Sequence, residues 1–262
     1  MRALGIDIGS LTTKVVILDD DRVLCSVVSP SSEEAETSAI AALDIAVAEA
    51  GLAHNADFYA VSTGIGGKSV SLSQQHKAMT TCLARGTHRL FPSARTVIDM
   101  GAESSTVVKI NERGRVSDWA NHDKCAAGSG VFLQQMSKLL QVTLADMSAL
   151  STGAKSRADI TNTCAVFAES EVISHIHSSP PTPKDEIVAG IYYSVVSRLM
   201  TLCKRLGIER EVAAAGGVAL NEGLVKVLEQ ELGFEVLVPD QPQSVAALGA
   251  AIIARENMEK GA

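Results

Sequence analysis

The apolar positions of this chain fall into two copies of one pattern. Residues 6–18, IDIGSLTTKVVIL, match residues 98–110, IDMGAESSTVVKI, 92 positions further on. Each copy has an apolar strand ending in Asp-x-Gly, a small polar turn and a β-branched second strand, and a polar corner then leads to a third strand. The repeat predicts two α/β lobes of like design, made by duplication and not as a solenoid.

Helical periodicity and further strands fill the rest of the chain. The pattern predicts helices at 34–51, about 69–85, 129–140, 144–150, 164–177, 185–206, 221–232 and 244–258. It predicts additional strands at 57–63, 211–217 and 234–239. We expect a first lobe over residues 1–95, with a closing helix at 244–260 packing back on it, and a second lobe over residues 96–243.

Length and charge narrow the class of protein. A chain of 262 residues with 46% apolar residues is long enough for one or two well-packed domains. Its formal net charge of −7 and its scattered Lys and Arg residues argue against a nucleic-acid or anionic-membrane surface. No apolar run approaches the roughly 20 residues that a bilayer requires, and Asp7 comes too early for a signal-peptide core. We expect a cytoplasmic protein whose partner is a protein or a small molecule.

The repeated Asp-x-Gly turns suggest a nucleotide site. Backbone amides in a tight turn can hydrogen-bond phosphate oxygens, and Gly, Ser and Thr let a phosphate approach closely. Two facing turns of this kind, with Asp7 and Asp99 beneath them to hold Mg²⁺ through water, would form a phosphate clamp. A third glycine-rich turn, AAAGGVALN at 213–221, suits the ribose and adenine end. Taken singly, each turn is also what an ordinary hairpin or strand end would carry.

With these turns in view, the chain resembles the actin, sugar-kinase and heat-shock-chaperone superfamily, whose α/β fold has two ribonuclease-H-like lobes. Within it the closer likeness is to the activator ATPases of 2-hydroxyacyl-CoA dehydratases and the related ATPase subunits of benzoyl-CoA reductases. The resemblance runs nearly end to end, from LGIDIGSLTTK through NHDKCAAGSG and TCAVFAESEVISHI to ALGAA. The two cysteine motifs are its most specific part.

Two cysteines stand at the starts of expected helices. Cys125 lies just before a glycine-rich turn and Cys164 before AVFAES, so both are placed where a helix dipole and free amides stabilise a thiolate. From the residues alone, two inert buried cysteines would be favoured. The resemblance implies instead that Cys125 and Cys164 of two chains together ligate one [4Fe–4S] cluster on a two-fold axis.

The other cysteines and histidines carry no comparable pattern. Five cysteines without a CxxC pair do not predict a disulfide framework, and we interpret Cys25, Cys82 and Cys203 as packing residues. A zinc site is disfavoured because closely spaced Cys/His pairs are absent. His122, three residues before Cys125, is interpreted as a solvent-facing or loop residue.

The predicted nucleotide contacts fall on four segments. We expect phosphate contacts from the first Asp-x-Gly turn, at Ser10, Leu11, Thr12, Thr13 and Lys14, and from the second turn, at Gly101 and Ala102. We expect adenosine contacts from the glycine pair and the helix cap after it, at Gly216, Gly217 and Asn221. The loop before the closing helix would contribute a further contact through Gln241 or Gln243. Asp7 and Asp99 would position Mg²⁺ or the attacking water.

One departure from the family pattern concerns the second turn. Dehydratase activators usually carry Gly-Gln-Asp there, whereas this chain has Ala102-Glu103-Ser104. An anionic Glu103 would repel phosphate unless Mg²⁺ bridges the two or the carboxyl is protonated, and it could equally be a base that orients water. The departure favours the benzoyl-CoA-reductase type, in which the partner in the dimer can be a homologous chain; homodimer and heterodimer both stay open.

The resemblance implies an ATPase coupled to electron transfer. ATP hydrolysis would drive delivery of one low-potential electron from the shared cluster to an acyl-CoA dehydratase or a benzoyl-CoA-type reductase, with ferredoxin or flavodoxin as the electron donor. Two alternatives stay open. One is a small-molecule kinase of the same fold, acting for example on a sugar, which would have no use for the two cysteines. The other is a nucleotide-dependent scaffold of the actin or chaperone kind.

Overall fold

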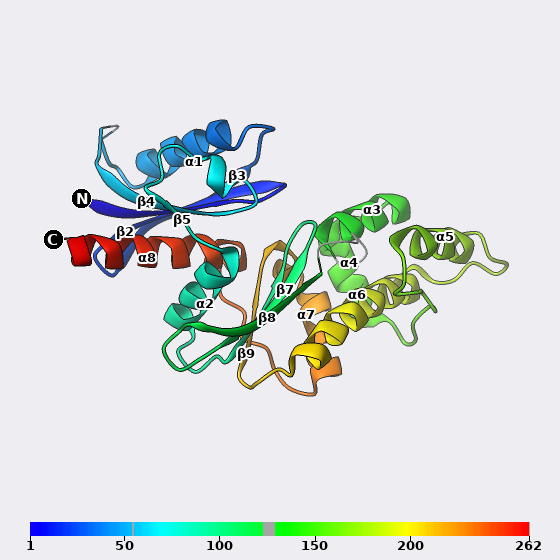
Figure 1. Cartoon of the computed structure of the whole chain (residues 1–262). Coiled ribbons are helices and arrows are strands. Elements are labelled where there is room, and N and C mark those ends of the chain that lie inside the picture. The colour runs from blue at the N-terminus through cyan, green and yellow to red at the C-terminus, as the bar shows by residue number, and fades with distance from the viewer. Residues whose placement is uncertain (54, 123–128, 262) are drawn as a thin grey trace. The chain divides into compact units, whose positions relative to one another are not determined.

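Two β-sheets with helices packed around them make up this protein (Figure 1). Its structure is a computed structural model that describes residues 1–53, 55–122 and 129–261. The chain divides into two compact units. The first unit comprises residues 1–97, 108–119 and 239–262, and the second comprises residues 98–107 and 120–238. The unit boundaries run through the strands of the second sheet.

The first sheet has five strands in the order β3-β2-β1-β4-β5. β1 pairs antiparallel with β2 and parallel with β4. Its hydrophobic inward positions pack against α1, and α8 packs on β1, β2 and β4. The elements of this unit are β1 (Arg2–Ile8), β2 (Thr12–Asp19), β3 (Arg22–Pro30), α1 (Ala35–Glu49), β4 (Phe58–Gly64), η1 (Gly67–Ser69), β5 (Gln75–His76), α2 (Met79–Leu90), η4 (Pro242–Ser244) and α8 (Val245–Gly261).

Glycines allow α8 to pack closely on its neighbours. A Cβ on Gly249 would collide with the carbonyl oxygen of Cys82 in α2, and a Cβ on Gly86 with that of Val245. A Cβ on Gly5 of β1 would likewise collide with the backbone of α8. The small residues of the closing helix therefore pack against both α2 and the sheet, as the sequence predicted.

The second sheet repeats the strand order of the first. Its order is β8-β7-β6-β9, which corresponds to β3-β2-β1-β4. This order confirms the predicted α/β fold with an internal duplication. The remaining elements are β6 (Thr96–Met100), β7 (Ser105–Ile110), β8 (Val116–His122), α3 (Gly130–Leu140), α4 (Leu144–Gly153), α5 (Ala165–Ile176), α6 (Lys184–Leu206), β9 (Val212–Ala215), η3 (Gly217–Leu220) and α7 (Glu222–Leu232).

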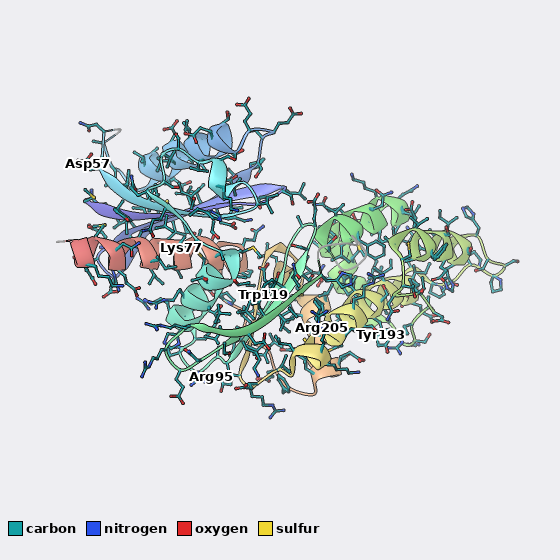
Figure 2. The ribbon with its side chains drawn as sticks, viewed as in Figure 1. Asp57, Lys77, Arg95, Trp119, Tyr193 and Arg205 are labelled. Carbon is teal, nitrogen blue, oxygen red and sulfur yellow. The ribbon has the colours of Figure 1, made fainter. Side chains whose placement is uncertain are left out.

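α6 is the central helix of the second unit's core. Twelve of its residues are buried, among them Tyr192, whereas Tyr193 and Arg205 lie on its outer side (Figure 2). By length and composition α6 is apolar enough to cross a membrane, but 61% of its most apolar window is buried inside the fold. Such burial is what the core helix of a globular unit shows.

Two expected elements differ from the structure. The helix expected at about 69–85 is instead a short 3₁₀ turn, the two-residue strand β5 and α2, because Gln75 and His76 pair with β4 and Gln74 Oε1 accepts a 2.5 Å hydrogen bond from Ala60 N. The strand expected at 234–239 is reduced to a single bridge at Leu237 beside β9. Pro239, at its end, has no N–H to extend the pairing.

Candidate functional site

The first Asp-x-Gly turn is a tight hairpin between β1 and β2. Gly9 N donates a 3.0 Å hydrogen bond to Thr12 O, and a Cβ on Gly9 would lie 2.9 Å from that oxygen. Ser31, at the end of β3, braces the turn, because its backbone N donates to Leu11 O and its hydroxyl to Gly9 O. The turn thus presents Ser10 and the half-exposed Leu11 at its tip.

A buried ion pair lies beneath this turn. Lys14 Nζ is 3.5 Å from Asp7 Oδ2 and donates a hydrogen bond to Thr12 O. Asp7 is 6% exposed, and within the described part of the chain its other carboxylate oxygen, Oδ1, has no hydrogen-bond partner. Burial raises the pKa of Asp7, and Lys14 opposes that rise. Thr13, fully buried, shares a hydrogen bond with Ser31.

The second Asp-x-Gly turn repeats the first in detail. Gly101 N donates a 2.9 Å hydrogen bond to Ser104 O, as Gly9 N does to Thr12 O. Here α3 is the brace, because the amides of Gly130 and Val131 donate to Gly101 O at 3.0 Å and to Ala102 O at 2.9 Å. Asp99, which precedes the turn, is 8% exposed.

A glycine lies against each aspartate, and the sequence motifs point to only one of these two glycines, Gly216. Gly216 follows β9 with φ +86°, and a Cβ there would lie 2.9 Å from Asp99 Oδ1. Gly64 ends β4 with φ +84°, and a Cβ there would lie 2.5 Å from Asp7 Oδ1. Because β4 and β9 occupy the same place in their sheets, Gly64 is the first-unit counterpart of Gly216.

The predicted adenosine residues lie together at the end of β9. Gly216 and Gly217 lead into the turn η3, and Asn221 caps α7 by accepting a hydrogen bond from Leu224 N. The Asn221 amide nitrogen donates to Tyr192 Oη at 2.6 Å and to Leu144 O. Asn221 therefore ties the start of α7 to α6 and α4.

The two glutamines lie in the first unit, in or beside η4. Gln241 is exposed and Gln243 is half-buried. Gln241 also borders a hollow of about 360 Å³, which β2 and β3 residues and the start of α8 line. The sequence-predicted residues thus form one group in each unit: the first turn, Asp7, Gln241 and Gln243 in one, and the second turn, Asp99, Gly216, Gly217 and Asn221 in the other.

Cys164 is the N-cap residue of α5, as predicted. Its thiol is free and partly exposed, and Val166 and Phe167, in the first turn of the helix, are 66% and 63% exposed. Cys125 lies outside the described residues. Over the ranges that the structure describes, no three His, Cys, Asp or Glu side chains could hold a metal ion together.

The remaining three cysteines are buried packing residues, in agreement with their interpretation from the sequence. Burial raises the pKa of Cys25 to about 11, helped by the hydrogen bond that its thiol donates to Glu49. Burial likewise raises the pKa of Cys82 to about 12 and that of Cys203 to about 11. These thiols stay protonated at neutral pH.

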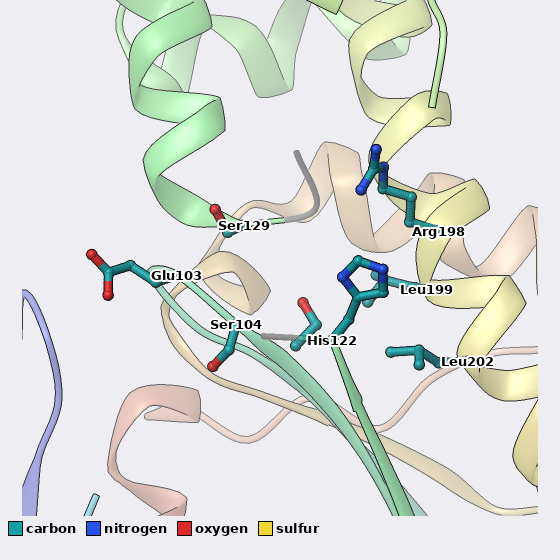
Figure 3. A pocket seen from close by; sticks show the side chains of 8 residues that line it. Glu103, Ser104, His122, Ser129, Arg198, Leu199 and Leu202 are labelled. Atoms are coloured by element: carbon teal, nitrogen blue, oxygen red, sulfur yellow. The ribbon is translucent and has the colours of Figure 1, made fainter. Parts of the chain in front are cut away.

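A small pocket lies behind the second turn (Figure 3). Glu103 is exposed, and Figure 3 shows its carboxylate pointing away from the other labelled side chains. Arg198 of α6 borders the same pocket and is 9% exposed. No sequence motif points to Arg198. The residues that line the pocket are Glu103, Ser104, Ser105, His122, Ser129, Arg198, Leu199 and Leu202.

Known proteins that match this chain in sequence include activators of acyl-CoA dehydratases and a benzoyl-CoA reductase subunit. The model of the BadF/BadG/BcrA/BcrD ATPase family matches residues 4–254. The 2-hydroxyisocaproyl-CoA dehydratase activator of Clostridioides difficile is 38% identical over 97% of this chain and 95% of its own. One of the benzoyl-CoA reductase subunits of Thauera aromatica is 34% identical over 78% of this chain and 73% of its own.

A solved structure agrees with these sequence matches. The activator of the 2-hydroxyisocaproyl-CoA dehydratase from Clostridium difficile, with bound ADPNP, superposes with a TM-score of 0.92. It is 37% identical to this chain, and the match covers 100% of this chain and 97% of that one.

Proposed function

Since the chain belongs to the BadF/BadG/BcrA/BcrD ATPase family, we propose that it couples ATP hydrolysis to delivery of a low-potential electron to an acyl-CoA dehydratase. The observation that carries the proposal is the duplicated turn: the same glycine hydrogen bond, Gly9 N to Thr12 O and Gly101 N to Ser104 O, follows a buried aspartate in each unit. Repetition of so specific a geometry favours one ligand that needs both copies.

That ligand is the polyphosphate of ATP. The partly exposed residues Ser10 and Thr12 of the first turn offer amides and hydroxyls that suit phosphate oxygens, and Lys14 supplies a positive charge beneath them. In the second turn Gly101 and Ala102 offer backbone close to the ligand. Gly216 and Gly217 offer the flat backbone on which adenosine can lie.

Asp7 is the residue best suited to Mg²⁺ or to the attacking water. Its Oδ1 atom is buried and lacks a partner among the residues described, and a buried carboxylate oxygen without a partner fits a hydrated cation. Mg²⁺ held through water by Asp7 and Asp99 would neutralise charge on the phosphates. Glu103, exposed at the second turn, orients water or accepts its proton.

The residues of α5 fit a cluster ligand. Cys164 has a free, partly exposed thiol at a helix N-terminus, where amides and the helix dipole stabilise anionic sulfur. With Cys125, and with the same pair from a second chain, it would complete the four thiolates of a [4Fe–4S] cluster. Such a cluster, when bound, supplies a one-electron centre. The exposed side chains of Val166 and Phe167 beside Cys164 suit a protein contact.

The chain itself offers a route from the nucleotide to the cysteine segment. The amides that begin α3 are hydrogen-bonded to the carbonyls of the second turn, and Ser129, the N-cap of α3, lies four residues after Cys125. A change in the turn when the γ-phosphate leaves therefore moves the start of α3. Cys125 is attached to that start by a short piece of chain.

The kind of partner follows from the relatives. Higher identity and fuller coverage favour a 2-hydroxyacyl-CoA dehydratase over a benzoyl-CoA reductase, in spite of Glu103. With a dehydratase as partner, a homodimer is the simpler assembly for the shared cluster. A reduced ferredoxin or flavodoxin in the cytoplasm would be the electron donor.

The test measures iron, sulfide and the EPR spectrum of anaerobically purified protein. We expect about four irons per dimer, lost in Cys125→Ser and in Cys164→Ser and retained in the control Cys203→Ser, together with ATP-dependent activation of a 2-hydroxyacyl-CoA dehydratase. The proposal would be overturned if the wild-type protein contained no iron and if Cys125→Ser and Cys164→Ser both left the ATPase activity unchanged. That result would leave the small-molecule kinase as the better explanation.

A further inference from the structure

The chain that leads into Cys164 is attached to α6 before it reaches the cysteine. Residues 157–162 make up this segment, which we call the strap. The Ala158 amide donates a 2.9 Å hydrogen bond to Glu186 O. Gly190 lies against the strap so closely that a Cβ there would collide with the Ala158 carbonyl oxygen. The backbone of the strap is therefore fixed against α6 near its start.

Two side-chain contacts continue this attachment along α6. The guanidinium carbon of Arg157 lies 3.2 Å from the centroid of the Tyr193 ring, and Asn162 Nδ2 donates a 2.7 Å hydrogen bond to Ser197 Oγ. The α6 positions that the strap contacts, 186, 190, 193 and 197, are three or four residues apart, so they share one side of the helix. The strap thus follows one side of α6 toward Cys164.

Glu171 attaches the end of the strap to α5. Its Oε2 atom accepts a 2.6 Å hydrogen bond from the backbone amide of Thr161, three residues before Cys164. Thr163 N donates a 3.2 Å hydrogen bond back to Thr161 Oγ1, which tightens the intervening turn. Glu171 lies seven residues after Cys164, about two turns along the same helix. The helix that Cys164 caps thus holds the chain that leads into Cys164.

The first turn of α5 has little packing of its own. Ala168 and Val172 are the buried residues of this helix, whereas Val166 and Phe167 in its first turn are 66% and 63% exposed. A helix end with few buried contacts opens easily. A hydrogen bond from an amide to a carboxylate is among the stronger ones. The Glu171 contact therefore holds the position of Cys164 where packing does little to hold it.

We propose that Glu171 is a positioning residue for Cys164 as a ligand of the cluster. The inference rests on the proposed function. Through the Thr161 amide, Glu171 keeps the chain before Cys164 in one conformation, so the thiolate loses less conformational freedom when it binds iron. Loss of such a contact behind a metal ligand typically lowers metal affinity by about 10- to 100-fold.

The first measurement is the rate at which an iron chelator removes the cluster from anaerobically purified protein. We expect Glu171→Ala, which lacks the acceptor for the Thr161 amide, to lose the cluster at least about tenfold faster than the wild type. Glu171→Gln keeps an oxygen acceptor without the charge and should restore most of the wild-type rate. Glu169→Ala removes a half-buried glutamate from the same helix and should behave as the wild type.

Three outcomes of this measurement lead to different conclusions. If Glu171→Ala retains the cluster as long as the wild type does, the inference is wrong and the proposed function stands. If Glu171→Gln loses the cluster as fast as Glu171→Ala, the charge and not the hydrogen bond matters, and the inference is wrong as well. Absence of iron from the wild type would instead overturn the proposed function.

The second measurement separates positioning of the ligand from support of the fold. The EPR signal of the reduced cluster should broaden in Glu171→Ala, because Cys164 then samples more positions, and should sharpen again in Glu171→Gln. In the Cys125→Ser/Cys164→Ser background, which cannot hold the cluster, Glu171→Ala should lower the thermal midpoint by no more than about 4 °C, the effect of one hydrogen bond. A larger fall together with an unchanged EPR signal would assign Glu171 to the fold and overturn the inference.

A variant of the strap itself keeps the inference testable if Glu171→Ala does not fold. Asn162 is exposed, and Asn162→Ala removes only its hydrogen bond to Ser197 Oγ. Because the strap then has one attachment fewer, we expect faster loss of the cluster in the same chelator assay. Wild-type retention of the cluster by Asn162→Ala would mean that the strap does not position Cys164.

Discussion

Gly64 and Gly216 hold equivalent positions behind the two buried aspartates. Both have a left-handed backbone, with φ of +84° and +86°, and a Cβ on either would lie within 3 Å of an aspartate oxygen, Asp7 Oδ1 or Asp99 Oδ1. Each would also collide with the carbonyl oxygen of the residue after that aspartate, Ile8 or Met100. The backbone thus comes close to both carboxylates in a way that only glycine allows.

Alanine at either glycine should damage both folding and ATP binding. The left-handed backbone and the carbonyl collision together should lower the free energy of unfolding by about 3 kcal/mol. Gly51→Ala and Gly233→Ala are matched controls with φ of +65° and +77° and nothing within 4 Å of the added Cβ, so they should lose only about 1 kcal/mol. Chemical denaturation and nucleotide titration measure the two effects. Equal losses in the site glycines and the controls would show that the close approach to the aspartates does not matter.

The buried carboxyl of Asp7 should make stability depend on pH. Burial raises the pKa of Asp7 in the folded state above its value of 3.8 in the unfolded chain, so the folded protein takes up a proton at a higher pH than the unfolded one. Stability from this group therefore increases as the pH falls through the folded-state pKa toward 3.8, and decreases as the pH rises.

Asp7→Asn removes that dependence. We expect the stability of the variant minus that of the wild type to be largest near pH 8 and to shrink steadily as the pH is lowered toward 4, in nucleotide-free protein. Asp44→Asn, on the exposed side of α1, gives the effect of losing a surface carboxylate from the same unit. A difference that grows as the pH falls would mean that Lys14, and not burial, has the larger effect on the pKa of the Asp7 carboxyl.

The fold was largely predictable because the duplication repeats the same order of apolar and polar positions in the sequence. The strand-turn-strand copies at 6–18 and 98–110 correspond to β1–β2 and β6–β7. The missed elements depend on distant partners. β5 is a strand because Gln75 and His76 pair with β4, and neither residue type nor periodicity records a pairing that short. The apolar stretch at 234–239 forms only one bridge, at Leu237.

The sequence predicted those parts of the site that recur at a fixed spacing along the chain, and it missed the others. The two turns are 92 residues apart, but Gly64 and Gly216 are 152 apart because α3 to α6 are inserted before β9. A comparison at one offset therefore aligns the turns and misses the glycines. Arg198 lies in VVSRLM, which reads as a core helix with a surface charge. Only the packing of α6 shows that this position is buried.

The cysteines should differ sharply in reactivity. In air-exposed Cys125→Ser protein at pH 8, a thiol reagent should label Cys164 rapidly, because it is free and partly exposed. The pKa values of about 11 to 12 for Cys25, Cys82 and Cys203 leave only about 10⁻³ to 10⁻⁴ of each as the reactive thiolate. Mass spectrometry should find one labelled cysteine in the folded chain and four after unfolding. Rapid labelling of a second cysteine would contradict the packing role assigned to these three.

Hydrogen exchange can follow the proposed route from nucleotide to cysteine segment. The amides of Gly130 and Val131 are hydrogen-bonded to Gly101 O and Ala102 O, so they exchange only when α3 separates from the second turn. An ATP analogue that cannot be hydrolysed should hold the turn and slow their exchange at least about tenfold relative to ADP. The amide of Gly233, bonded to Glu229 O at the far end of α7, is the internal control and should not change. Equal exchange at Gly130 and Val131 with both nucleotides would mean that the γ-phosphate does not act through α3, and the coupling would then have to reach Cys164 through α5 instead.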